Sequence, residues 1–520
     1  MSERKYPIGI QNFESLRKDG YMYVDKTAWV YKLVNTGRYY FLSRPRRFGK
    51  SLLLSTIEAY LEGKRELFEG LAIEQLEKNW TKHPILHLDL NTEKYTTPEA
   101  LDAILDDALS GWESLYGRRE SERSLSLRFQ GIIRRACEQT GERVVILVDE
   151  YDKPMLQAIG NPELQTAYRD TLKAFYGALK SRDGYIKFAM LTGVTKFGKV
   201  SVFSDLNNLQ DISMWDRYAD VCGVSEEELL RDFSGDIRML GEANGMSEEE
   251  TLAKLRENYN GYHFCEDCIG VYNPFSLLNT FAQKRFRSYW FETGTPTYLV
   301  ELLKMHRYNL EDLAHEVTTA DVLNSVDSAS TNPVPVVYQS GYLTIKDYDK
   351  EFETYTLGFP NREVEEGFVK FLMPYYTTAD KQRSGFEIQQ FVREMRGGQT
   401  DAFLRRLQSL MADTSYEQLG PEREVYYRNV VFIVAKLMGF YVQAEYHTSH
   451  GRIDLVIGTD KYVYVFEFKL DGTAEEALQQ INDKQYTLPF SKDGRQVFKV
   501  GVNFSKETRN IERWLIEGQK

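Results

Sequence analysis

The stretch from Tyr39 to Ala59, YYFLSRPRRFGKSLLLSTIEA, constrains the fold of this chain more than any other. Its apolar start predicts a buried strand over Tyr39–Leu42, and an apolar pattern with helical spacing begins at Lys50. A tight basic loop, Ser43–Gly49, lies between them. A strand, a short loop and a helix in this order direct backbone N–H groups and the positive end of the helix at one point, where phosphate groups bind well. The stretch therefore predicts an α/β domain that binds a nucleoside triphosphate.

The side chains of the loop suit that role. The Lys50 ammonium can reach the β- and γ-phosphates, and the Ser51 hydroxyl can ligate Mg²⁺. Gly49, Lys50 and Ser51 fit the P-loop pattern, whereas position 44 holds Arg where the pattern has its first Gly. A basic loop that only caps a helix is the alternative. The expected nucleotide contacts are Arg46, Arg47, Phe48, Gly49, Lys50 and Ser51.

A second motif favours the nucleotide interpretation. In VVILVDEYDKP, Val144–Pro154, five apolar residues lead directly into Asp149 and Glu150. Asp149 would hold Mg²⁺, directly or through water, and Glu150 would act as the general base that polarises the attacking water. The alternative is that the two acids only mark the end of a strand. Because the GKS loop lies upstream with predicted strands between the two motifs, we favour the catalytic interpretation.

Four short apolar runs alternate with helical patterns and predict a parallel sheet covered on both faces. The runs are Tyr39–Leu42, Ile85–Leu90, Val144–Val148 and Tyr185–Leu191. Polar residues follow each run, as expected if ligands gather at the carboxyl ends of the strands. Thr192 follows the last run and is a candidate sensor of the γ-phosphate, although a Thr at a strand end also serves as an ordinary turn or capping residue.

Length, charge and cysteines limit the remaining choices. A chain of 520 residues is too long for one core, and a formal charge of −12 means that any nucleic-acid contact must use local basic patches or metal ions. The four cysteines are few and unevenly spaced, which indicates a reducing compartment rather than a disulfide framework. No apolar run approaches the length of a membrane span, and MSERKYPIGI lacks a signal-peptide core. We therefore expect a cytoplasmic protein with no membrane partner.

Residues 216–298 are predicted to form a mostly helical lid. Ser225 and Ser247 each precede a Glu by three residues, which is the capping box that starts a helix. Cys265 and Cys268 form a lone CxxC, and His263 alone does not complete a zinc site. We therefore assign no metal to this segment.

Six segments in the first 290 residues together resemble the AAA-ATPase-like family of bacterial proteins. They are YVDKTAWV (Tyr23–Val30), FLSRPRRFGKSLL (Phe41–Leu53), VDEYDKP (Val148–Pro154), LTGVTKF (Leu191–Phe197), NGYHF (Asn260–Phe264) and YNPFSLLN (Tyr272–Asn279). Arg44 itself belongs to that family's RPRRFGKS loop. The resemblance implies a P-loop core that binds ATP, over residues 1–215.

The middle segment, residues 299–385, mixes helical and strand-like patterns. A helix end, a short hairpin and another helix suggest a winged-helix-like module. A wing can contact DNA, but this one is not markedly basic, so packing between domains is the interpretation that we favour. The composition turns polar from Thr377 to Gly398, and the last boundary is placed there, at residue 386.

The C-terminal part carries a second set of chemical groups. GRIDLVIG (Gly451–Gly458) and YVYVFEFKLD (Tyr462–Asp471) are strand-like runs joined by a short turn, which predicts a hairpin. If the turn has two residues, Asp454 lies opposite Val465, and Glu467 is its diagonal neighbour at about 7–8 Å. Carboxylates on so apolar a strand cost on the order of a few kcal/mol unless they are paired or bind a metal ion.

The C-terminal part resembles the PD-(D/E)XK nuclease superfamily over Glu422–Phe504. The resemblance is carried by Asp454, followed one hairpin later by Glu467 and Lys469. Ile453 stands where the literal motif has Pro. The resemblance implies that Asp454 and Glu467 bind Mg²⁺ or Mn²⁺. Lys469 would position or activate the attacking water. Further residues implied near the site are Gln480, Tyr486 and one of Glu445 and Glu424. A plain ion pair between Glu467 and Lys469 is the alternative.

The sequence thus predicts an α/β protein with four parts. They are a P-loop NTPase parallel-sheet core (1–215), a helical lid (216–298), a winged-helix-like segment (299–385) and a restriction-endonuclease-like α/β domain (386–520). We expect an ATPase that uses ATP and Mg²⁺, joined to a metal-dependent nuclease of a bacterial defence, mobile-element or toxin system. Nucleic acid is the expected partner, with DNA favoured over RNA, and a homo-oligomer is compatible with the sequence. The alternative is a nucleotide-dependent switch or scaffold whose nuclease-like domain binds without cutting.

Overall fold

The computed structural model of the chain divides into two compact units. One is Met1–Thr293 with His315–Glu363, and the other is Gly294–Ala314 with Val364–Lys520. The four predicted segments are finer than this division, and their boundaries stay predictions. The structure describes residues 4–519 except 92–93, 197–202, 204–207, 294–298, 301, 304–305, 307, 311, 315, 325–331, 378–383, 412–422, 440–442, 447–453, 471, 491–493, 506 and 508–509.

The larger unit is built on a five-stranded parallel sheet with the strand order β2-β3-β4-β1-β5. The strands are β1 (Tyr39–Ser43), β2 (Ile85–Asp89), β3 (Val144–Asp149), β4 (Ile186–Gly193) and β5 (Gln210–Asp211). The predicted parallel sheet is confirmed, and every residue of β1 and β3 is buried because helices cover both faces. Nothing in the sequence predicts β5, because two residues carry no periodic pattern.

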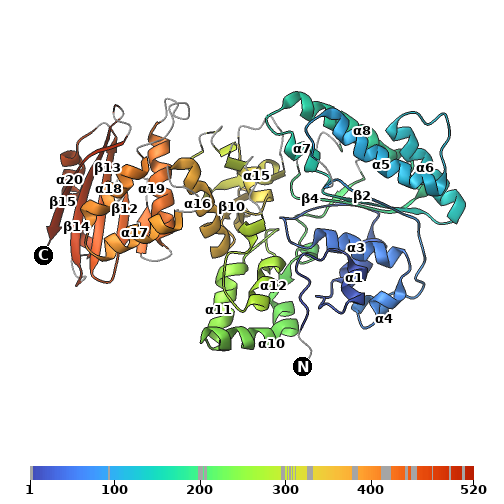
Figure 1. The fold of residues 1–520 in the computed structure, drawn as a ribbon, viewed down its shortest axis with the longest axis horizontal. Coiled ribbons are helices and arrows are strands. Elements are labelled where there is room, and N and C mark those ends of the chain that lie inside the picture. Colours follow the sequence, from blue (N-terminus) through green and yellow to red (C-terminus); the bar gives the residue numbers. More distant parts are fainter. Residues whose placement is uncertain are drawn as a thin grey trace. The chain divides into compact units, whose positions relative to one another are not determined.

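Eight helices of the described chain flank or connect the strands of this sheet. They are α1 (Phe13–Lys18), α2 (Thr27–Thr36), α3 (Lys50–Leu61), α4 (Ala72–Leu76), α5 (Pro98–Tyr116), α6 (Leu125–Thr140), α7 (Lys153–Gln157) and α8 (Pro162–Ser181). Figure 1 shows α5, α6 and α8 together on one face of the sheet, and α1 and α3 on the other. The basic loop joins β1 to α3, so the N-terminus of α3 opens at the carboxyl edge of the sheet.

Three helices and a two-stranded ribbon follow the sheet in the chain. They are β6 (Val224–Ser225), α10 (Glu226–Asn244), α11 (Glu248–Tyr259), β7 (Val271–Tyr272) and α12 (Pro274–Gln283). Both predicted capping boxes are present, with Ser225 bonded reciprocally to Glu228 and Ser247 to Glu250. The mostly helical character of the predicted lid is therefore confirmed.

The next elements have the order of a winged-helix-like module. They are β8 (Val317–Thr319), α14 (Ala320–Asn324), α15 (Val334–Gln339), β9 (Thr344–Asp349) and β10 (Thr354–Gly358). The strands form an antiparallel sheet in the order β8-β10-β9, with two helices between the first strand and the hairpin. The hairpin tip, Lys350–Glu353, holds two glutamates and one lysine, so its charge does not favour contact with a phosphate backbone.

The smaller unit is a mixed five-stranded sheet with helices, as predicted for its α/β class. Its strands β11 (Gln443–Tyr446), β12 (Leu455–Gly458), β13 (Tyr462–Leu470), β14 (Gln496–Ser505) and β15 (Asn510–Gln519) follow one another across the sheet. Only β13 and β14 pair in parallel among these described strands. The helices are α16 (Arg362–Tyr376), α17 (Ser384–Arg396), α18 (Thr400–Met411), α19 (Arg423–Gly439) and α20 (Ala474–Asp483). The boundary between the two units, at Glu363 and Val364, falls within α16.

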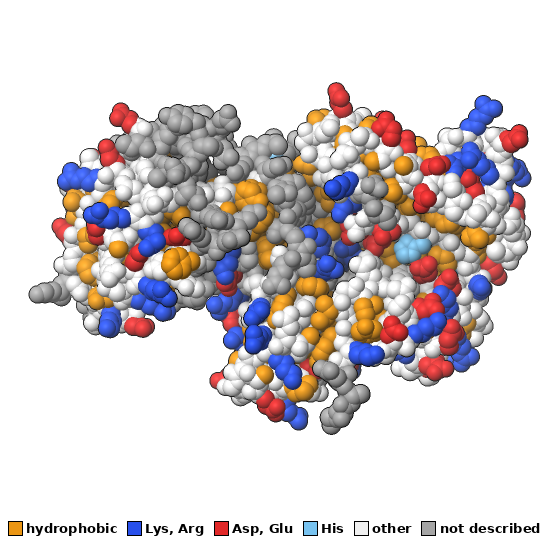
Figure 2. Space-filling model, in the orientation of Figure 1, with side chains coloured by type: hydrophobic (Ala, Val, Ile, Leu, Met, Phe, Trp, Pro, Cys, Tyr) orange, Lys and Arg blue, Asp and Glu red, His pale blue; other side chains and the backbone are white. Residues whose placement is uncertain are grey.

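Short 3-10 helices complete the described elements, at Arg65–Phe68, Asp183–Tyr185, Asp216–Tyr218, Trp290–Thr293, Asp312–Ala314 and Leu488–Phe490. Within the described part of the chain, no helix combines the length and the apolar character needed to cross a bilayer. On the face drawn in Figure 2, the coloured Lys and Arg side chains are interspersed with Asp and Glu.

Candidate functional site

The loop between β1 and α3 borders an open pocket of about 310 Å³. Five of the six predicted nucleotide contacts line it: Arg46, Arg47, Gly49, Lys50 and Ser51. Arg47 has φ = 66° and Gly49 has φ = 94°, which is the left-handed region that lets the loop curl tightly before the helix. The loop therefore gathers two guanidinium groups, an ammonium group and a hydroxyl at the positive end of α3.

Lys50 is buried at the base of this pocket. Its Nζ donates to the carbonyl oxygens of Arg44 at 3.0 Å and Pro45 at 3.2 Å. Both partners are neutral carbonyls of the loop itself, and no carboxylate among the described residues forms an ion pair with Lys50. The ammonium can therefore exchange these bonds for phosphate oxygens at little electrostatic cost.

Phe48, the sixth predicted contact, faces a different environment. Its ring centroid lies 4.7 Å from that of Tyr262 and 5.7 Å from that of Phe264. It also lines an apolar cavity that shares Gly49 and Leu52 with the pocket beside the loop. Phe48 is thus placed beside an apolar extension of the pocket and not among its charged groups.

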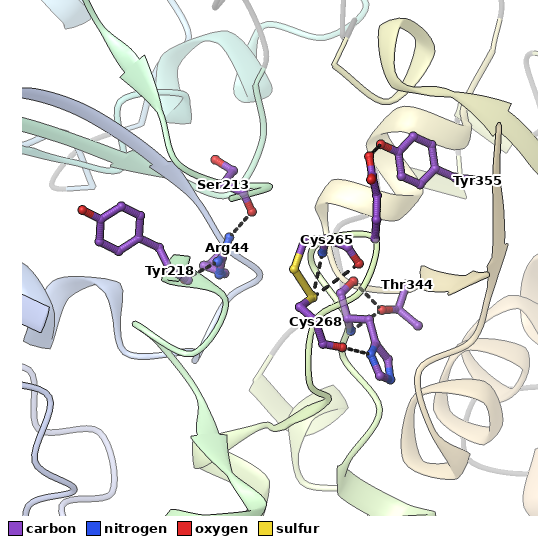
Figure 3. The surroundings of a disulfide bond; sticks show 9 residues. Arg44, Ser213, Tyr218, Cys265, Cys268, Thr344 and Tyr355 are labelled. Carbon is purple, nitrogen blue, oxygen red and sulfur yellow. Dashed lines mark hydrogen bonds between the residues drawn. A yellow bond between two sulfur atoms is a disulfide. The ribbon is translucent and has the colours of Figure 1, made fainter. Parts of the chain in front are cut away.

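Arg44, which replaces the first Gly of the P-loop pattern, points into the protein (Figure 3). Its guanidinium donates to the carbonyl oxygens of Ser43 at 2.9 Å, Ser213 at 2.7 Å and Tyr218 at 3.1 Å. It also lies 4.0 Å from the ring centroid of Phe264, and burial lowers the pKa of Arg44. Arg44 therefore ties the loop to the segment 213–218 and is not directed at a ligand.

Cys265 and Cys268 form a disulfide, with their Cα atoms 5.4 Å apart (Figure 3). Cys137 and Cys222 are free. The CxxC pair therefore departs from the reduced cysteines that the sequence suggests, because the tight turn after Phe264 brings the two sulfur atoms together. The imidazole Nδ1 of His263 lies 3.0 Å from the carbonyl oxygen of Cys268.

The acidic side of the pocket lies at the end of β3. Asp149 Oδ1 accepts hydrogen bonds from the Thr192 hydroxyl at 2.6 Å and from the Glu150 N–H at 3.0 Å. Glu150 has φ = 53°, which turns the chain out of the strand, and its carboxyl group lines the pocket. Burial raises the pKa of Glu150, and the ammonium groups of Lys50 and Lys153 partly offset that rise. A raised pKa suits a general base that works near neutral pH.

Further residues line the pocket without a predicted role. They are residues 7–11, Leu52, Asn91, Lys153, Pro274, Phe275 and Leu278. The segment 7–11 carries no periodic or motif signal, so the sequence alone could not connect it to the loop. Lys153 does carry a signal, because it follows Glu150 by three residues within the same motif.

The second group of candidate residues lies on the hairpin of β12 and β13, where the predicted register is wrong. Gly458 pairs with Val463, so four residues and not two separate the paired positions. The Thr459 Oγ1 accepts from the Tyr462 N–H at 3.0 Å and stabilises this longer turn. Continuing the register places Asp454 directly opposite Glu467, in place of Val465, and Asp454 Oδ2 accepts from the Phe468 N–H at 2.8 Å.

Glu467 is buried and only partly satisfied. Its Oε1 accepts from Lys469 Nζ at 3.3 Å and from Gln480 Nε2, whereas its Oε2 is buried without a hydrogen-bond partner among the described residues. Burial, followed by the charge of Asp454, raises the pKa of Glu467 to about 7. An orphaned carboxylate oxygen beside a second carboxylate is what a divalent cation would satisfy, so the residues present fit Mg²⁺ or Mn²⁺.

Gln480 connects this cluster to helix α20. Its amide nitrogen donates to Glu467, its amide oxygen accepts from Lys469 Nζ, and its nitrogen lies 3.4 Å from the Tyr486 hydroxyl. The structure therefore brings Asp454, Glu467, Lys469 and Gln480 together. The side chains of Glu424 and Glu445 lie outside the described residues. Within those residues, no group of three His, Cys, Asp or Glu side chains is placed to hold a metal ion.

Comparisons with known proteins match both parts of the chain. A family described as "Predicted AAA-ATPase" matches residues 7–203, and the PD-(D/E)XK nuclease superfamily matches residues 422–514. The chain is 36% identical over 527 residues to an uncharacterized protein in the vnfD 5' region of Azotobacter chroococcum mcd 1, and the match covers 99% of each chain. A solved structure of the Aeropyrum pernix ORC2 protein in ADPNP–ADP complexes matches at 10% identity over 64% of this chain and 88% of that chain. The TM-score of that match is 0.24.

Proposed function

Since the chain belongs to the predicted AAA-ATPase family and carries a domain of the PD-(D/E)XK nuclease superfamily, we propose that it is a metal-dependent nuclease controlled by ATP. One observation carries the proposal. Each of the two residue sets converges in space: the cationic loop faces Glu150 across one pocket, and Asp454, Glu467, Lys469 and Gln480 form one cluster.

In the first site, the loop and the N-terminus of α3 bind the β- and γ-phosphates of ATP, with Lys50 on the phosphate oxygens. Ser51 and Asp149 would hold Mg²⁺, which neutralises phosphate charge when bound. Glu150 accepts the proton of the attacking water. Thr192 donates its hydroxyl to Asp149, so it would sense the γ-phosphate by positioning this carboxylate.

The base of the nucleotide occupies the apolar cavity beside the loop. That cavity is lined by apolar side chains such as Val24, Phe48, Leu53 and Val221. Because it shares Gly49 and Leu52 with the phosphate pocket, one ligand can fill both. A base with a polar phosphate chain has this division into apolar and charged parts.

In the second site, Asp454 and Glu467 would hold Mg²⁺ or Mn²⁺, which would activate water and polarise the scissile phosphate when bound. Lys469 positions or activates the water and offsets charge on the phosphate. Gln480 holds both Glu467 and Lys469 by hydrogen bonds and fixes their spacing. The substrate is nucleic acid, with DNA favoured over RNA, in a bacterial defence, mobile-element or toxin system.

Cleavage assays test this function directly. DNA and RNA are incubated with Mg²⁺ and ATP and with the wild type, Lys469→Ala or Lys50→Ala, and Lys461→Ala serves as a control on the exposed turn of the same hairpin. We expect cutting by the wild type and Lys461→Ala only. Equal cutting by the wild type and Lys469→Ala would remove the nuclease assignment.

A nucleotide-dependent switch or scaffold is the second candidate. It is favoured by one observation, namely that Lys469 and Gln480 already satisfy one oxygen of Glu467 without a metal ion. Titration separates the candidates, because tight nucleic-acid binding that needs no metal and leads to no cleavage supports the scaffold.

A further inference from the structure

ATP hydrolysis builds negative charge on the γ-phosphate oxygens, and P-loop enzymes offset it with a cation beyond the P-loop lysine, from the same chain or from a partner. Four cationic side chains line the phosphate pocket: Arg46, Arg47, Lys50 and Lys153. The first three belong to the loop and the first residue of α3. Of these four, Lys153 alone approaches from the end of β3, the side that also supplies Glu150.

The turn after β3 presents Glu150 and Lys153 together. The Lys153 N–H donates to the Glu150 carbonyl oxygen at 3.0 Å, which closes a four-residue turn. The two residues inside the turn, Tyr151 and Asp152, are fully buried. Tyr151 donates its hydroxyl to the Thr195 carbonyl oxygen at 3.0 Å, and Asp152 accepts from the Thr195 N–H at 2.6 Å and hydroxyl at 2.7 Å. The first and last residues of the turn therefore line the pocket, while the middle two fix it to Thr195, two residues beyond the end of β4.

The Lys153 ammonium has no partner among the residues that the structure describes. No side-chain hydrogen bond or ion pair joins it to these residues, and the buried acid inside the turn, Asp152, is bonded to Thr195 instead. Lys153 lines the pocket together with Glu150 and Lys50. A partly exposed ammonium that is held beside a general base, with no acceptor among the described side chains, is available for an anionic ligand.

We propose that Lys153 is a catalytic residue of the ATPase reaction that contacts a γ-phosphate oxygen on the side opposite Lys50, in the same chain. The proposal rests on the proposed ATPase function. In the reaction, water bonds to the γ-phosphorus, the bond from that phosphorus to the β–γ bridging oxygen breaks, and ADP leaves with the electron pair. Glu150 takes the proton of the water, and Lys153 transfers none, because its role is to offset charge. Hydrolysis then needs no cation from a second copy.

The test compares ATP binding and single-turnover hydrolysis in the wild type and Lys153→Met. We expect the ATP affinity of Lys153→Met to stay within about threefold of the wild type and its hydrolysis rate to fall by at least about 30-fold. A cation of this kind raises the kcat of other P-loop enzymes by about 10³–10⁵. Lys153→Arg should recover part of the rate. Lys180→Met, on the exposed end of α8, is the matched control and should hydrolyse ATP at the wild-type rate.

A mixing experiment tests whether the cation acts within one chain. Lys153→Met retains its P-loop, and Lys50→Ala retains Lys153, so a cation supplied by a neighbour would restore hydrolysis in the mixture. We expect no recovery, and a wild-type rate per chain that is independent of protein concentration. Recovery on mixing would overturn the assignment to the same chain.

The pH profile separates direct contact from an effect through Glu150. If Lys153 only kept Glu150 ionised, Lys153→Met would regain the wild-type rate at high pH, which would overturn the catalytic role. We expect the loss to persist across the profile. Hydrolysis by Lys153→Met at the wild-type rate overturns the inference alone, whereas a wild type that binds ATP without hydrolysing it overturns the ATPase function and the inference together.

Discussion

At the scale of single residues, both candidate sites use carboxyl groups whose protonation is altered by burial. Glu150 and Glu467 each have a raised pKa with a lysine nearby, and for Glu467 the value is about 7. A pKa near neutrality means that modest changes of pH alter the charge of the site. Because a metal ion binds only the ionised carboxylate, proton and metal compete for Glu467.

This competition predicts the pH dependence of metal binding. Below pH 7 Glu467 is mostly protonated, so the apparent affinity for Mn²⁺ should fall by about tenfold between pH 8 and pH 6. Calorimetric titration with Mn²⁺ at several pH values measures it. Glu467→Gln should bind weakly with no such dependence, and a wild-type affinity that stays constant from pH 6 to pH 8 would contradict the metal site.

Glu467 also affects the stability of the metal-free protein. The pH dependence of this contribution is opposite in sign to that of an ordinary carboxylate, whose pKa is lowered on folding. A pKa raised from 4.5 to about 7 contributes stability that is complete below pH 4.5 and is lost as the pH rises through 7. Glu467→Gln should therefore stabilise the metal-free protein relative to the wild type at pH 8 more than at pH 5, as read from denaturant unfolding.

Residue roles were predictable where a short local pattern determines them. Gly49, Lys50 and Ser51 could be assigned from the strand, loop and helix order, because their positions depend on neighbours in sequence. The inward direction of Arg44 could not, since its acceptors Ser213 and Tyr218 are brought close only by the folded sheet. A buried guanidinium that binds three backbone carbonyls leaves no pattern around position 44.

At the scale of elements, the sheet and the helix starts followed from sequence, and the hairpin register did not. Apolar runs determine β1 to β4, and Ser-Glu spacing determines the starts of α10 and α11. The register of β12 and β13 depends on a four-residue turn closed by Thr459, which the alternation of side chains cannot distinguish from a two-residue turn, because both keep the same face buried. The correction moves Asp454 from a diagonal position to the one directly opposite Glu467.

The position of Gln480 depends on how closely α20 packs on β14. Gly501 permits that contact, because a Cβ atom there would lie 2.4 Å from the Ala474 carbonyl oxygen and 2.7 Å from the Leu478 nitrogen. Gly501→Ala must therefore push the backbone of α20 away, at a cost of about 1–3 kcal/mol in the free energy of unfolding. It should also weaken Mn²⁺ binding, since Gln480 moves with the helix.

Chemical denaturation and Mn²⁺ titration measure the two effects of Gly501→Ala. Gly494→Ala is the matched control, because no atom lies within 4 Å of the added Cβ, and it should change the free energy of unfolding by less than about 0.5 kcal/mol. Unchanged stability in Gly501→Ala would show that the helix can accommodate the methyl group and that Gln480 is held by other contacts.

At the scale of the whole molecule, the two candidate sites lie in different compact units, each with its own buried core. ATP can control cleavage only if the nucleotide changes a binding or catalytic property of the other unit. Such coupling is a free energy shared by the two ligands, so it must act equally in both directions on their affinities.

That reciprocity gives a test that needs no cleavage. In Lys469→Ala, which should bind DNA without cutting it, saturating ATP analogue should change the DNA dissociation constant by the same factor as saturating DNA changes that of the analogue. Couplings of this kind are typically about 5- to 150-fold. Fluorescence anisotropy measures the first factor and calorimetry the second.

Lys50→Ala combined with Lys469→Ala should show no effect of the analogue on DNA affinity, because the P-loop lysine is missing. A factor below about twofold in both directions would mean that the ATPase unit does not control DNA binding, and control would then have to act on the chemical step alone.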